Sequence, residues 1–376
     1  MRIAVNTRLL LKDKLEGIGW YTFETLSRIV KSHPEHEFYF LFDRPYSEEF
    51  VFEKNVHPIV INPPTRHPIL WYIWFELRIP KILKQINADI FLSTDGFISL
   101  SCKTPSIAVI HDINFAHHPK DLKYGHRKFY NHFFKKYAKK ATRIVTVSNY
   151  SKKDICNTYN IEESKIDVSL NGVNSKFHPI GLHKQIAIRK KYSEGKDYFL
   201  FVGALHPRKN ISRLLQAFDQ FKSITKSSNK LLIVGAKMWW NKDLKTSFEN
   251  LQHKEDVIFT GRKNLEELNQ LYASALAFCY IPYFEGFGLP IIEAMKCACP
   301  VITSNCTAMP EVAGDAALLV NPFEISEIAN TMITLNTNSE LRSELSARGQ
   351  IHSQHFNWNK TANALWESIE KVLDKC

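Results

Sequence analysis

Two carboxylates flank a glycine-rich turn in the segment IPYFEGFGLPIIEA, residues 281–294. Glu285 precedes the glycines and Glu293 follows them. Pro290 suits a first helical turn, because its missing N–H would have no partner there, so the segment predicts a helix start. N–H groups at such a start are unpaired and carry partial positive charge, and glycines let an anion approach them closely. We interpret the turn as a phosphate-binding site.

The positions of the two glutamates indicate which groups they could contact beside this phosphate. At ~1.5 Å rise per residue, Glu293 lies about one turn into the predicted helix and can face hydroxyls next to the phosphate. Glu285 stays on the loop and can meet the group beyond the phosphate. A nucleotide sugar offers these groups in that order. The alternative is a helix with a glycine entry and an exposed glutamate, which is a common arrangement.

The chain continues MKCACPVITSNCTAMPEVAGDAALLVNP after this turn. Together with EGFGLPIIEA, this run resembles the C-terminal signature of the retaining glycosyltransferases of family 4, whose motif is two glutamates separated by seven residues. The resemblance implies an α/β protein of the GT-B fold, with two Rossmann-like doubly wound domains facing a central cleft. Relatives usually carry glycine where this chain has Ala298. We expect this extra methyl group to lie near the site and to tighten the pocket.

A basic loop follows a predicted strand at VGALHPRKN and precedes the helical pattern ISRLLQAFDQF. Arginine offers a planar fork of donors and lysine a mobile point charge, and both suit a diphosphate. By resemblance, Lys209 and Arg208 neutralise the leaving diphosphate. Some relatives also carry arginine directly after the residue that matches Gly203, where this chain has Ala204. A basic loop that is merely solvated is the alternative.

The resemblance also implies the remaining site residues. IAVIHDINF ends a predicted strand, and its histidine is expected to line the sugar pocket and to support the charge developing at the anomeric carbon through its backbone carbonyl. EGIGWYTFETL holds a glycine pair that an ordinary turn explains about as well; relatives often have arginine where this chain has Trp20. The catalytic set is then His111, Glu285, Lys209 and Arg208. The donor-binding set is Gly17, Gly19, Gly203, Gly286, Phe287, Gly288, Leu289 and Glu293.

Metal ligands of the expected kind are missing from the sequence. No Asp-x-Asp triplet is present that would hold a divalent cation against a diphosphate. We therefore expect a metal-independent enzyme without a cofactor, in which the nucleotide sugar is the substrate. The seven cysteines are an odd number without a CxxC pair, which predicts buried free thiols rather than disulfides or a metal site.

Composition is that of a globular protein large enough for two domains, with 376 residues, 44% hydrophobic and 23% charged. No stretch approaches the ~18 to 20 uninterrupted apolar residues of a transmembrane helix. The N-terminal segment MRIAVNTRLLLKDKLEG lacks a long apolar region and a small-residue cleavage site, so we interpret it as a first strand. We expect a cytoplasmic protein that can reach the inner face of the cell membrane peripherally.

Positive charge is concentrated in the first part of the chain, where residues 1–180 contain 26 Lys and Arg against 18 Asp and Glu, within a total net charge of +11. A basic surface can attract nucleic acid or an anionic membrane, and an equal alternative is a surface without function. HRKFYNHFFKKYAKK mixes aromatic and basic residues and suits either membrane docking or a solvated face. LWYIWFELRIPKILK is better explained as a core helix packed by Trp71, Trp74 and Phe75. We expect no nucleic acid partner.

Strand and helix patterns alternate along the chain, which is typical of doubly wound parallel sheets. We place an N-terminal acceptor-side domain at 1–180, a donor-side domain at 181–355, and a C-terminal helix at 356–376 that, by resemblance, returns to the first domain. The linker is expected between Asn171 and His183, where Gly, Pro and polar residues accumulate. Strands are expected in ten apolar runs: RIAVNT, FYFLF, ADIFLS, SIAVIHD, RIVTVS, YFLFVG, LLIVG, VIFTG, LAFCYIP and PVITS.

Among family members, a Gly-Ile-Gly start with His-Asp and Pro-Arg-Lys-Asn segments is commonest in mannosyl- and rhamnosyltransferases of surface polysaccharide assembly. The resemblance therefore implies transfer of a hexose, with mannose from GDP-mannose as the first hypothesis, to a glycan or a polyprenyl-linked glycan. Two alternatives stay open from the sequence. A nucleotide-sugar 2-epimerase shares the fold, and a non-enzymatic basic binding protein would share the charge.

Overall fold

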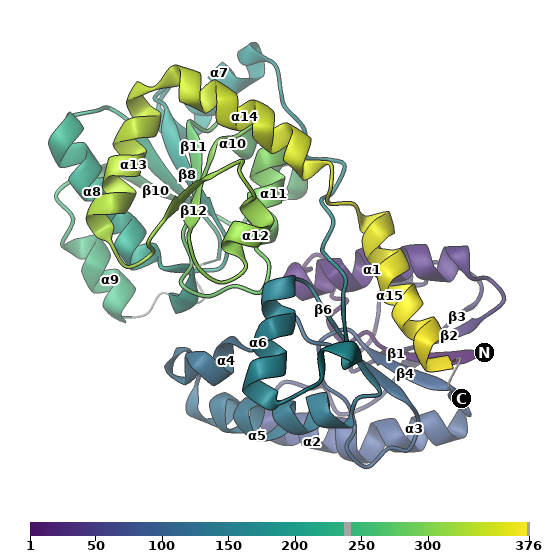
Figure 1. The fold of residues 1–376 in the computed structure, drawn as a ribbon. Coiled ribbons are helices and arrows are strands. Elements are labelled where there is room, and N and C mark those ends of the chain that lie inside the picture. The colour runs from purple at the N-terminus through teal and green to yellow at the C-terminus, as the bar shows by residue number, and fades with distance from the viewer. Residues whose placement is uncertain (237–241, 374–376) are drawn as a thin grey trace. The chain divides into compact units, whose positions relative to one another are not determined.

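A computed structural model describes residues 1–236 and 242–373, without the side chains of residues 242 and 243. The chain forms two compact units. The first joins Met1–Gly172 to Asn357–Cys376, and the second is Val173–Phe356. Each unit is an α/β layer structure built on one parallel sheet (Figure 1).

The sheet of the first unit has seven parallel strands in the order β3-β2-β1-β4-β5-β6-β7. Helices α1 and α15 cover one face, and α2, α3 and α5 cover the other (Figure 1). Its strands are β1 (Arg2–Asn6), β2 (Glu37–Phe42), β3 (Val56–Val60), β4 (Ile90–Ser93), β5 (Ser106–Val109), β6 (Arg143–Thr146) and β7 (Ile166–Val168). Its α-helices are α1 (Gly17–Ser32), α2 (Pro68–Tyr72), α3 (Ile79–Gln85), α4 (Asn114–His117), α5 (Tyr124–Lys140), α6 (Asn149–Tyr159) and α15 (Trp358–Leu373). A π-helical stretch, η2 (Ile73–Arg78), joins α2 to α3, and short 3₁₀ turns lie at η1 (Glu48–Phe50), η3 (Pro119–Asp121) and η4 (Glu163–Lys165).

The second unit has six parallel strands in the order β10-β9-β8-β11-β12-β13. Its strands are β8 (Tyr198–Val202), β9 (Lys230–Val234), β10 (Val257–Gly261), β11 (Ala277–Tyr280), β12 (Val301–Ser304) and β13 (Leu318–Val320). Its α-helices are α7 (Leu182–Ser193), α8 (Ile211–Thr225), α9 (Lys242–Glu249), α10 (Leu265–Ser274), α11 (Leu289–Lys296), α12 (Met309–Ala313), α13 (Ile325–Thr337) and α14 (Ser339–Ser353). Short 3₁₀ turns lie at η5 (Pro207–Lys209) and η7 (Lys254–Asp256).

All ten predicted strands are present, and three further strands were not predicted. The strands that were found include every central strand of both sheets, whose residues are buried on both faces and form continuous apolar runs. The missed strands β3, β7 and β13 all lie at sheet edges. Two of them have only three residues, and β3 contains Pro58. An edge strand pairs on one side only, so its sequence need not carry the same apolar signal.

The predicted division after residue 180 is displaced from the observed one, because residues 173–180 belong to the second unit. Phe177 is fully buried there with its ring 5.8 Å from that of Tyr272, and the His178 N–H donates to the Asn269 side chain at 2.8 Å. The linker therefore docks on the second unit through both apolar and polar contacts. Composition marked the segment as a loop but carried no information about which unit it packs on.

The C-terminal helix α15 packs against α1 in the first unit (Figure 1). Its residues Leu365 and Ile369 are fully buried, and the Ser169 hydroxyl donates to the Thr361 carbonyl at 2.9 Å. The crossover from the second unit comes at Asn357, one residue after the predicted start of this segment. Residues 374–376 of the predicted segment lie outside the described residues.

Candidate active site

The two basic residues predicted to bind the diphosphate and the first glutamate of the motif lie together in the second unit, at the point of the sheet where the strand order reverses. β8 and β11 are neighbours there, while the chain continues from them towards opposite edges of the sheet. In α/β sheets, ligands bind beyond the carboxyl ends of strands at such a switch point. Arg208 and Lys209 follow β8, and Glu285 follows β11. The position alone makes this loop pair the candidate site of the unit.

Glu285 lies between the two cations and is only 7% exposed. An Arg208 terminal nitrogen is 2.7 Å from its carboxylate, and the Lys209 ammonium contacts the same oxygen as well as the Tyr280 hydroxyl. Burial alone would raise the pKa of Glu285, but Arg208 and Lys209 outweigh it and hold that pKa below its usual range. Glu285 is therefore ionised and fixes both cations at the end of the strand.

The turn η5 presents the cations on a short, capped backbone. The His206 ring accepts the Arg208 N–H at 3.3 Å, and the Asn210 amide donates to the Pro322 carbonyl at 2.6 Å. Burial and the neighbouring Arg208 and Lys209 charges lower the pKa of His206 to about 4. His206 is thus a neutral acceptor at physiological pH, and it orders the loop without adding positive charge.

The glycine-rich turn requires glycine at position 288 for two reasons. Gly288 precedes α11 with a φ of +97°, in the left-handed region, and a Cβ there would lie 2.8 Å from the Met309 methyl group. Phe287 is buried and packs on Phe356. Leu289 then begins α11 directly after Gly288, so the predicted helix start is confirmed. This is the arrangement that anion binding at a helix N-terminus needs.

Gly203, the remaining predicted glycine of this unit, directly follows β8 and packs against Gly235. Its N–H donates to the Val234 carbonyl at 2.9 Å, and a Cβ on Gly235 would overlap the Gly203 carbonyl. The two glycines therefore let β8 and β9 close against each other at the sheet edge that carries the site.

Glu293 lies on α11, half-buried, and accepts a hydrogen bond from the Tyr272 hydroxyl at 3.0 Å. Burial raises the pKa of Glu293 to about 7, against the opposing effect of this hydrogen bond. Sequence reasoning missed Tyr272, because its segment LEELNQLYAS shows only the apolar spacing of a helix. The partner could not be inferred without the packing of α10 on α11.

The expectation for Ala298 was wrong. Ala298 lies beyond the C-terminal end of α11, at the opposite end from Gly288, and its φ of +60° is left-handed. Glycine in relatives is explained by this helix-ending conformation, which glycine adopts without steric cost. Its carbonyl accepts the Ser346 hydroxyl, which holds the turn in place.

Ala298→Gly is therefore expected to stabilise the protein by about 1 kcal/mol. A left-handed non-glycine residue costs roughly 1–2 kcal/mol in the folded protein. The larger conformational entropy that glycine gives the unfolded chain offsets part of the gain. Urea denaturation measures the difference. Ala347→Gly, at an exposed position inside α14, is the matched control and should destabilise by a similar amount. If both substitutions destabilise, the left-handed backbone at 298 is not a source of strain.

His111 follows β5 in the first unit, at the carboxyl edge of that sheet. Its Nε2 lies 2.9 Å from the Thr94 carbonyl oxygen, and its ring meets the Tyr21 ring edge-on at 4.9 Å. Burial lowers the pKa of His111, so the ring is neutral and donates to Thr94. The backbone carbonyl assigned to charge stabilisation accepts the Ser151 hydroxyl at 3.2 Å, which leaves it one further lone pair.

The glycine pair of the first unit divides into two functions. Gly17 begins α1 and has open space around its Cα, whereas a Cβ on Gly19 would lie 3.0 Å from the Leu9 carbonyl oxygen. Gly19 is thus needed for the packing of α1 on the preceding loop. At Gly17, where no other atom lies within 4 Å of a Cβ position, a ligand can approach the backbone.

Two family models divide the chain between them. The model of "Glycosyltransferase Family 4" matches residues 15–177, and that of "Glycosyl transferases group 1" matches residues 184–352. The O-antigen chain mannosyltransferase B of Escherichia coli is 30% identical over 93% of this chain and 94% of its own length. This chain is a family 4 glycosyltransferase. A second relative, the O-antigen chain mannosyltransferase RfbU of Salmonella typhimurium, is 33% identical over 68% of the chain and 67% of the relative.

Solved structures agree on the fold of this glycosyltransferase. Anabaena Alr3699/HepE in complex with UDP and glucose superposes with a TM-score of 0.77 at 17% identity, covering 98% of this chain and 99% of that one. WaaG, a glycosyltransferase involved in lipopolysaccharide biosynthesis, gives 0.75 at 17% identity, covering 96% and 98%. The two parallel sheets with interleaved helices are those of the GT-B fold, as the resemblance implied.

Two further expectations concern what the glycosyltransferase lacks. Within the ranges that the structure describes, no helix combines the length and apolar character needed to cross a membrane. The six cysteines in those ranges are free thiols, five of them buried, as predicted. Cys376 lies outside the described residues.

Proposed function

We propose that this glycosyltransferase moves a mannosyl group from GDP-mannose to a glycan or polyprenyl-linked glycan, with retention of anomeric configuration, in the synthesis of a cell-surface polysaccharide. The observation that carries the proposal is the similarity to O-antigen chain mannosyltransferase B over nearly the full length of both chains. The family assignment removes the support for the 2-epimerase and for the non-enzymatic binding protein.

The second unit supplies groups suited to the donor. Arg208, Lys209 and the N–H groups at the start of α11 are positioned to stabilise the charge that develops on the leaving diphosphate. Glu293 is suited to accept hydrogen bonds from the ribose hydroxyls. Glu285, which lies between Arg208 and Lys209, is suited to contact the sugar beyond the diphosphate.

Chemically, the bond between the anomeric carbon and the diphosphate oxygen breaks ahead of bond formation, which gives an oxocarbenium-like centre. By the family resemblance, support of this positive charge is assigned to the His111 carbonyl. The acceptor hydroxyl oxygen then bonds to the anomeric carbon on the same face, and its proton passes to the leaving phosphate oxygen. The proposal needs no metal ion, since the diphosphate charge is met by Arg208, Lys209 and helix N–H groups.

The experiment supplies purified protein with GDP-mannose and a methyl α-mannoside acceptor, in the presence of excess EDTA. Release of GDP with an α-linked disaccharide product in the NMR spectrum is the expected result. A β-linked product contradicts retention, and activity that appears only when magnesium or manganese is restored contradicts metal independence. Conversion of the nucleotide sugar without an acceptor would indicate epimerase chemistry instead.

Peripheral contact with an anionic membrane belongs to the same proposal, and α5 supports it. This helix has six Lys and Arg residues and no acidic residue. A groove of about 490 Å³ lies between α2 and α5, lined mainly by apolar side chains with Lys128 among them. Ile69 and Tyr72 on its border remain 64% and 48% exposed, which suits insertion among lipid chains next to phosphate head groups.

Replacing Lys135, Lys136, Lys139 and Lys140 by glutamine is expected to reduce flotation with anionic vesicles at low salt, since each basic residue near such a surface contributes about 1 kcal/mol. High salt should weaken the binding of the parent protein. The matched control replaces four exposed lysines of the second unit and removes the same charge: Lys184, Lys190, Lys191 and Lys196. Equal losses in both variants, or no binding of the parent, would leave α5 a solvated face.

A further inference from the structure

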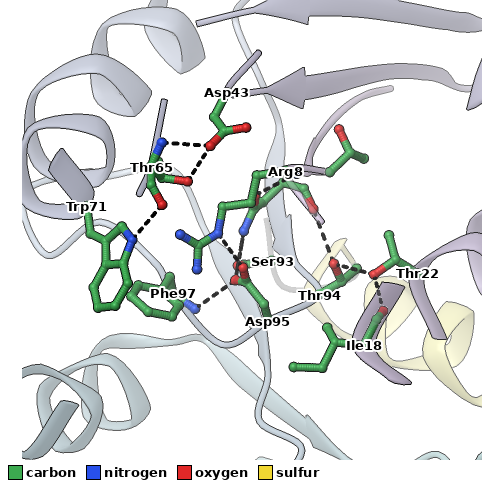
Figure 2. Close-up of polar contacts among 12 residues, drawn as sticks. Arg8, Ile18, Thr22, Asp43, Thr65, Trp71, Ser93, Thr94, Asp95 and Phe97 are labelled. Atoms are coloured by element: carbon green, nitrogen blue, oxygen red, sulfur yellow. Dashed lines mark hydrogen bonds and ion pairs between the residues drawn. The ribbon is translucent and has the colours of Figure 1, made fainter. Parts of the chain in front are cut away.

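The first unit has its own switch point, and a buried ion pair lies there. β1 and β4 are neighbours in the middle of the sheet, with β2 and β3 on one side and β5 to β7 on the other. Arg8 follows β1 and Asp95 follows β4. The Arg8 Nε lies 2.6 Å from an Asp95 carboxylate oxygen, and each residue is only 7% exposed (Figure 2). Charges are rarely buried to this extent without a function or full pairing.

Asp95 has a complete set of partners. Its second carboxylate oxygen accepts from the Asn6 amide at 2.8 Å, the Ser93 hydroxyl at 3.1 Å and the Phe97 N–H at 3.3 Å. These donors come from β1, the end of β4 and the loop after it, so the carboxylate is fixed in one orientation. Asp95 therefore serves as an anchor for Arg8 rather than as an open acceptor.

Arg8, in contrast, has donors left over. Among the described residues, no hydrogen-bond acceptor is recorded for either terminal amino group of its guanidinium, which offers four N–H donors there. The group is instead held by aromatic rings. Its central carbon lies 4.3 Å from the Phe97 centroid and 5.9 Å from that of Trp71 (Figure 2), and 5.2 Å from that of Phe75. The Trp71 indole is itself fixed by a hydrogen bond to the Thr65 carbonyl at 2.8 Å.

Within the described part of the chain, the terminal nitrogens of Arg8 are not among the fully buried side-chain atoms that lack a hydrogen-bond partner, so they reach solvent and can meet a ligand. Arg8 keeps 7% exposure, so it is not sealed in the core. The same construction occurs in the second unit, where Arg208 and Lys209 follow the first strand of the switch point and Glu285 follows its neighbour. The two units thus place a cation pinned by a carboxylate at corresponding points of their sheets.

The surroundings of Arg8 favour a neutral partner over an anion. Its positive charge is already matched by the Asp95 carboxylate, whose oxygen lies 2.6 Å from the Arg8 Nε. The remaining guanidinium donors therefore suit a neutral hydrogen-bond acceptor. Hydroxyl oxygens of a sugar accept hydrogen bonds from guanidinium without adding charge.

The Arg8–Asp95 ion pair is also connected to His111 through a short hydrogen-bond network. The Thr94 carbonyl accepts a hydrogen bond from the His111 ring N–H. The Thr94 hydroxyl donates to the Asn6 carbonyl at 3.2 Å. The Thr22 hydroxyl on α1 donates to Thr94 at 2.8 Å (Figure 2). Arg8 and the histidine assigned to the sugar pocket therefore lie on one hydrogen-bonded edge of the sheet.

We propose that Arg8, held by Asp95 and the aromatic rings, donates its terminal amino groups to hydroxyl oxygens of the acceptor sugar. This site rests on the proposed function, because it takes the acceptor to be a glycan. Arg8 is then a binding residue that fixes which acceptor hydroxyl is presented. It takes no part in binding the nucleotide.

Arg8→Lys tests the proposal with methyl α-D-mannopyranoside as the acceptor and GDP-mannose as the donor. Lysine keeps a charge for Asp95 but loses the terminal fork, so the apparent KM for the mannoside is expected to rise about tenfold or more, the scale of a lost charge-assisted hydrogen bond. GDP affinity should stay within about twofold. Arg143→Lys is the matched control, because Arg143 in the same unit pairs with Asp167 at 2.7 Å, and one of its two terminal amino groups already donates to that carboxylate and to the Ser164 carbonyl.

An unchanged mannoside KM in Arg8→Lys, or an equal rise in Arg143→Lys, would overturn the proposal. If the variant does not fold, hydrogen exchange on the unaltered protein decides. Adding the mannoside is expected to slow backbone exchange in residues 7–10 and 94–98 and to leave β13 unaffected. If the mannoside does not slow exchange in these two loops, the proposed acceptor site at Arg8 is wrong. Failure of the proposed function is distinguishable, since it would appear as absent GDP binding and absent transfer while the mannoside still protects these loops.

Discussion

Lys209→Ala is expected to lower turnover at least ~100-fold, the scale of losing one preorganised charge stabiliser in an active site. The Lys209 ammonium contacts the Glu285 carboxylate at the end of β11, where the diphosphate charge would develop. Arg208 still pairs with Glu285 in the variant, so the buried carboxylate keeps a partner and folding is expected to be nearly unchanged. Turnover at saturating donor and the urea midpoint are the two measurements.

Lys230 provides a matched control for this substitution. Its side chain is 13% exposed, as is that of Lys209, and it pairs with Asp256 at 2.8 Å in the same unit. Lys230→Ala removes an ion-paired lysine of equal burial from a place remote from the switch point, so it should cost stability but not turnover. If the two variants have the same turnover, Lys209 has no special role in the reaction.

The fold was predictable because its central strands can be recognised from the sequence. Both faces of these strands are covered, which forces continuous apolar runs such as YFLFV in β8. The Gly-to-helix step at 286–290 was equally clear, since only glycine fits the left-handed position at Gly288 next to Met309. Where the local backbone alone constrains the residue type, the sequence carries the information.

The remaining parts of the site depend on contacts between distant segments. Tyr272 meets Glu293, and Asp95 meets Arg8, only because helices and strands far apart in the chain are packed together. Arg8 gave no signal within the run NTRLLLKDK, which contains three other basic or acidic residues. Likewise, Ala298 was expected near the site but lies beyond the C-terminal end of α11, and spacing alone does not show where this helix ends. Pairings of this kind need the tertiary structure.

The pH dependence of nucleotide affinity follows from the second glutamate. Glu293 has a pKa raised to about 7 by burial, so in the free protein it is half protonated near neutrality. Ribose hydroxyls are donors, and binding them favours the ionised carboxylate. Binding therefore releases a proton below pH 7. GDP affinity is expected to rise with pH from about 6 to 7, by up to about tenfold per unit, and to level off above 7.

Glu293→Gln is expected to weaken GDP binding by about tenfold or more at pH 8 and to flatten this pH dependence. The variant also serves as the control for titration of the GDP phosphate itself, which has a pKa near 6 and changes equally in both proteins. Glu285→Gln should keep the pH dependence and the GDP affinity, because the pKa of Glu285 is held below its usual range and its proposed contact is with the sugar. Calorimetry across this pH range provides both measurements.

Tyr272→Phe separates the carboxylate from its hydrogen bond. The Tyr272 hydroxyl lowers the pKa of Glu293, so its removal should raise that pKa further and move the rise in GDP affinity to higher pH. The direction of this displacement identifies the titrating group, because no change at Glu285 or at the nucleotide phosphate would follow from a substitution on α10. If the GDP affinity of the parent protein does not depend on pH, the titrating role of Glu293 is wrong. If Glu285→Gln loses GDP affinity and Glu293→Gln does not, the assignments of the two glutamates are reversed.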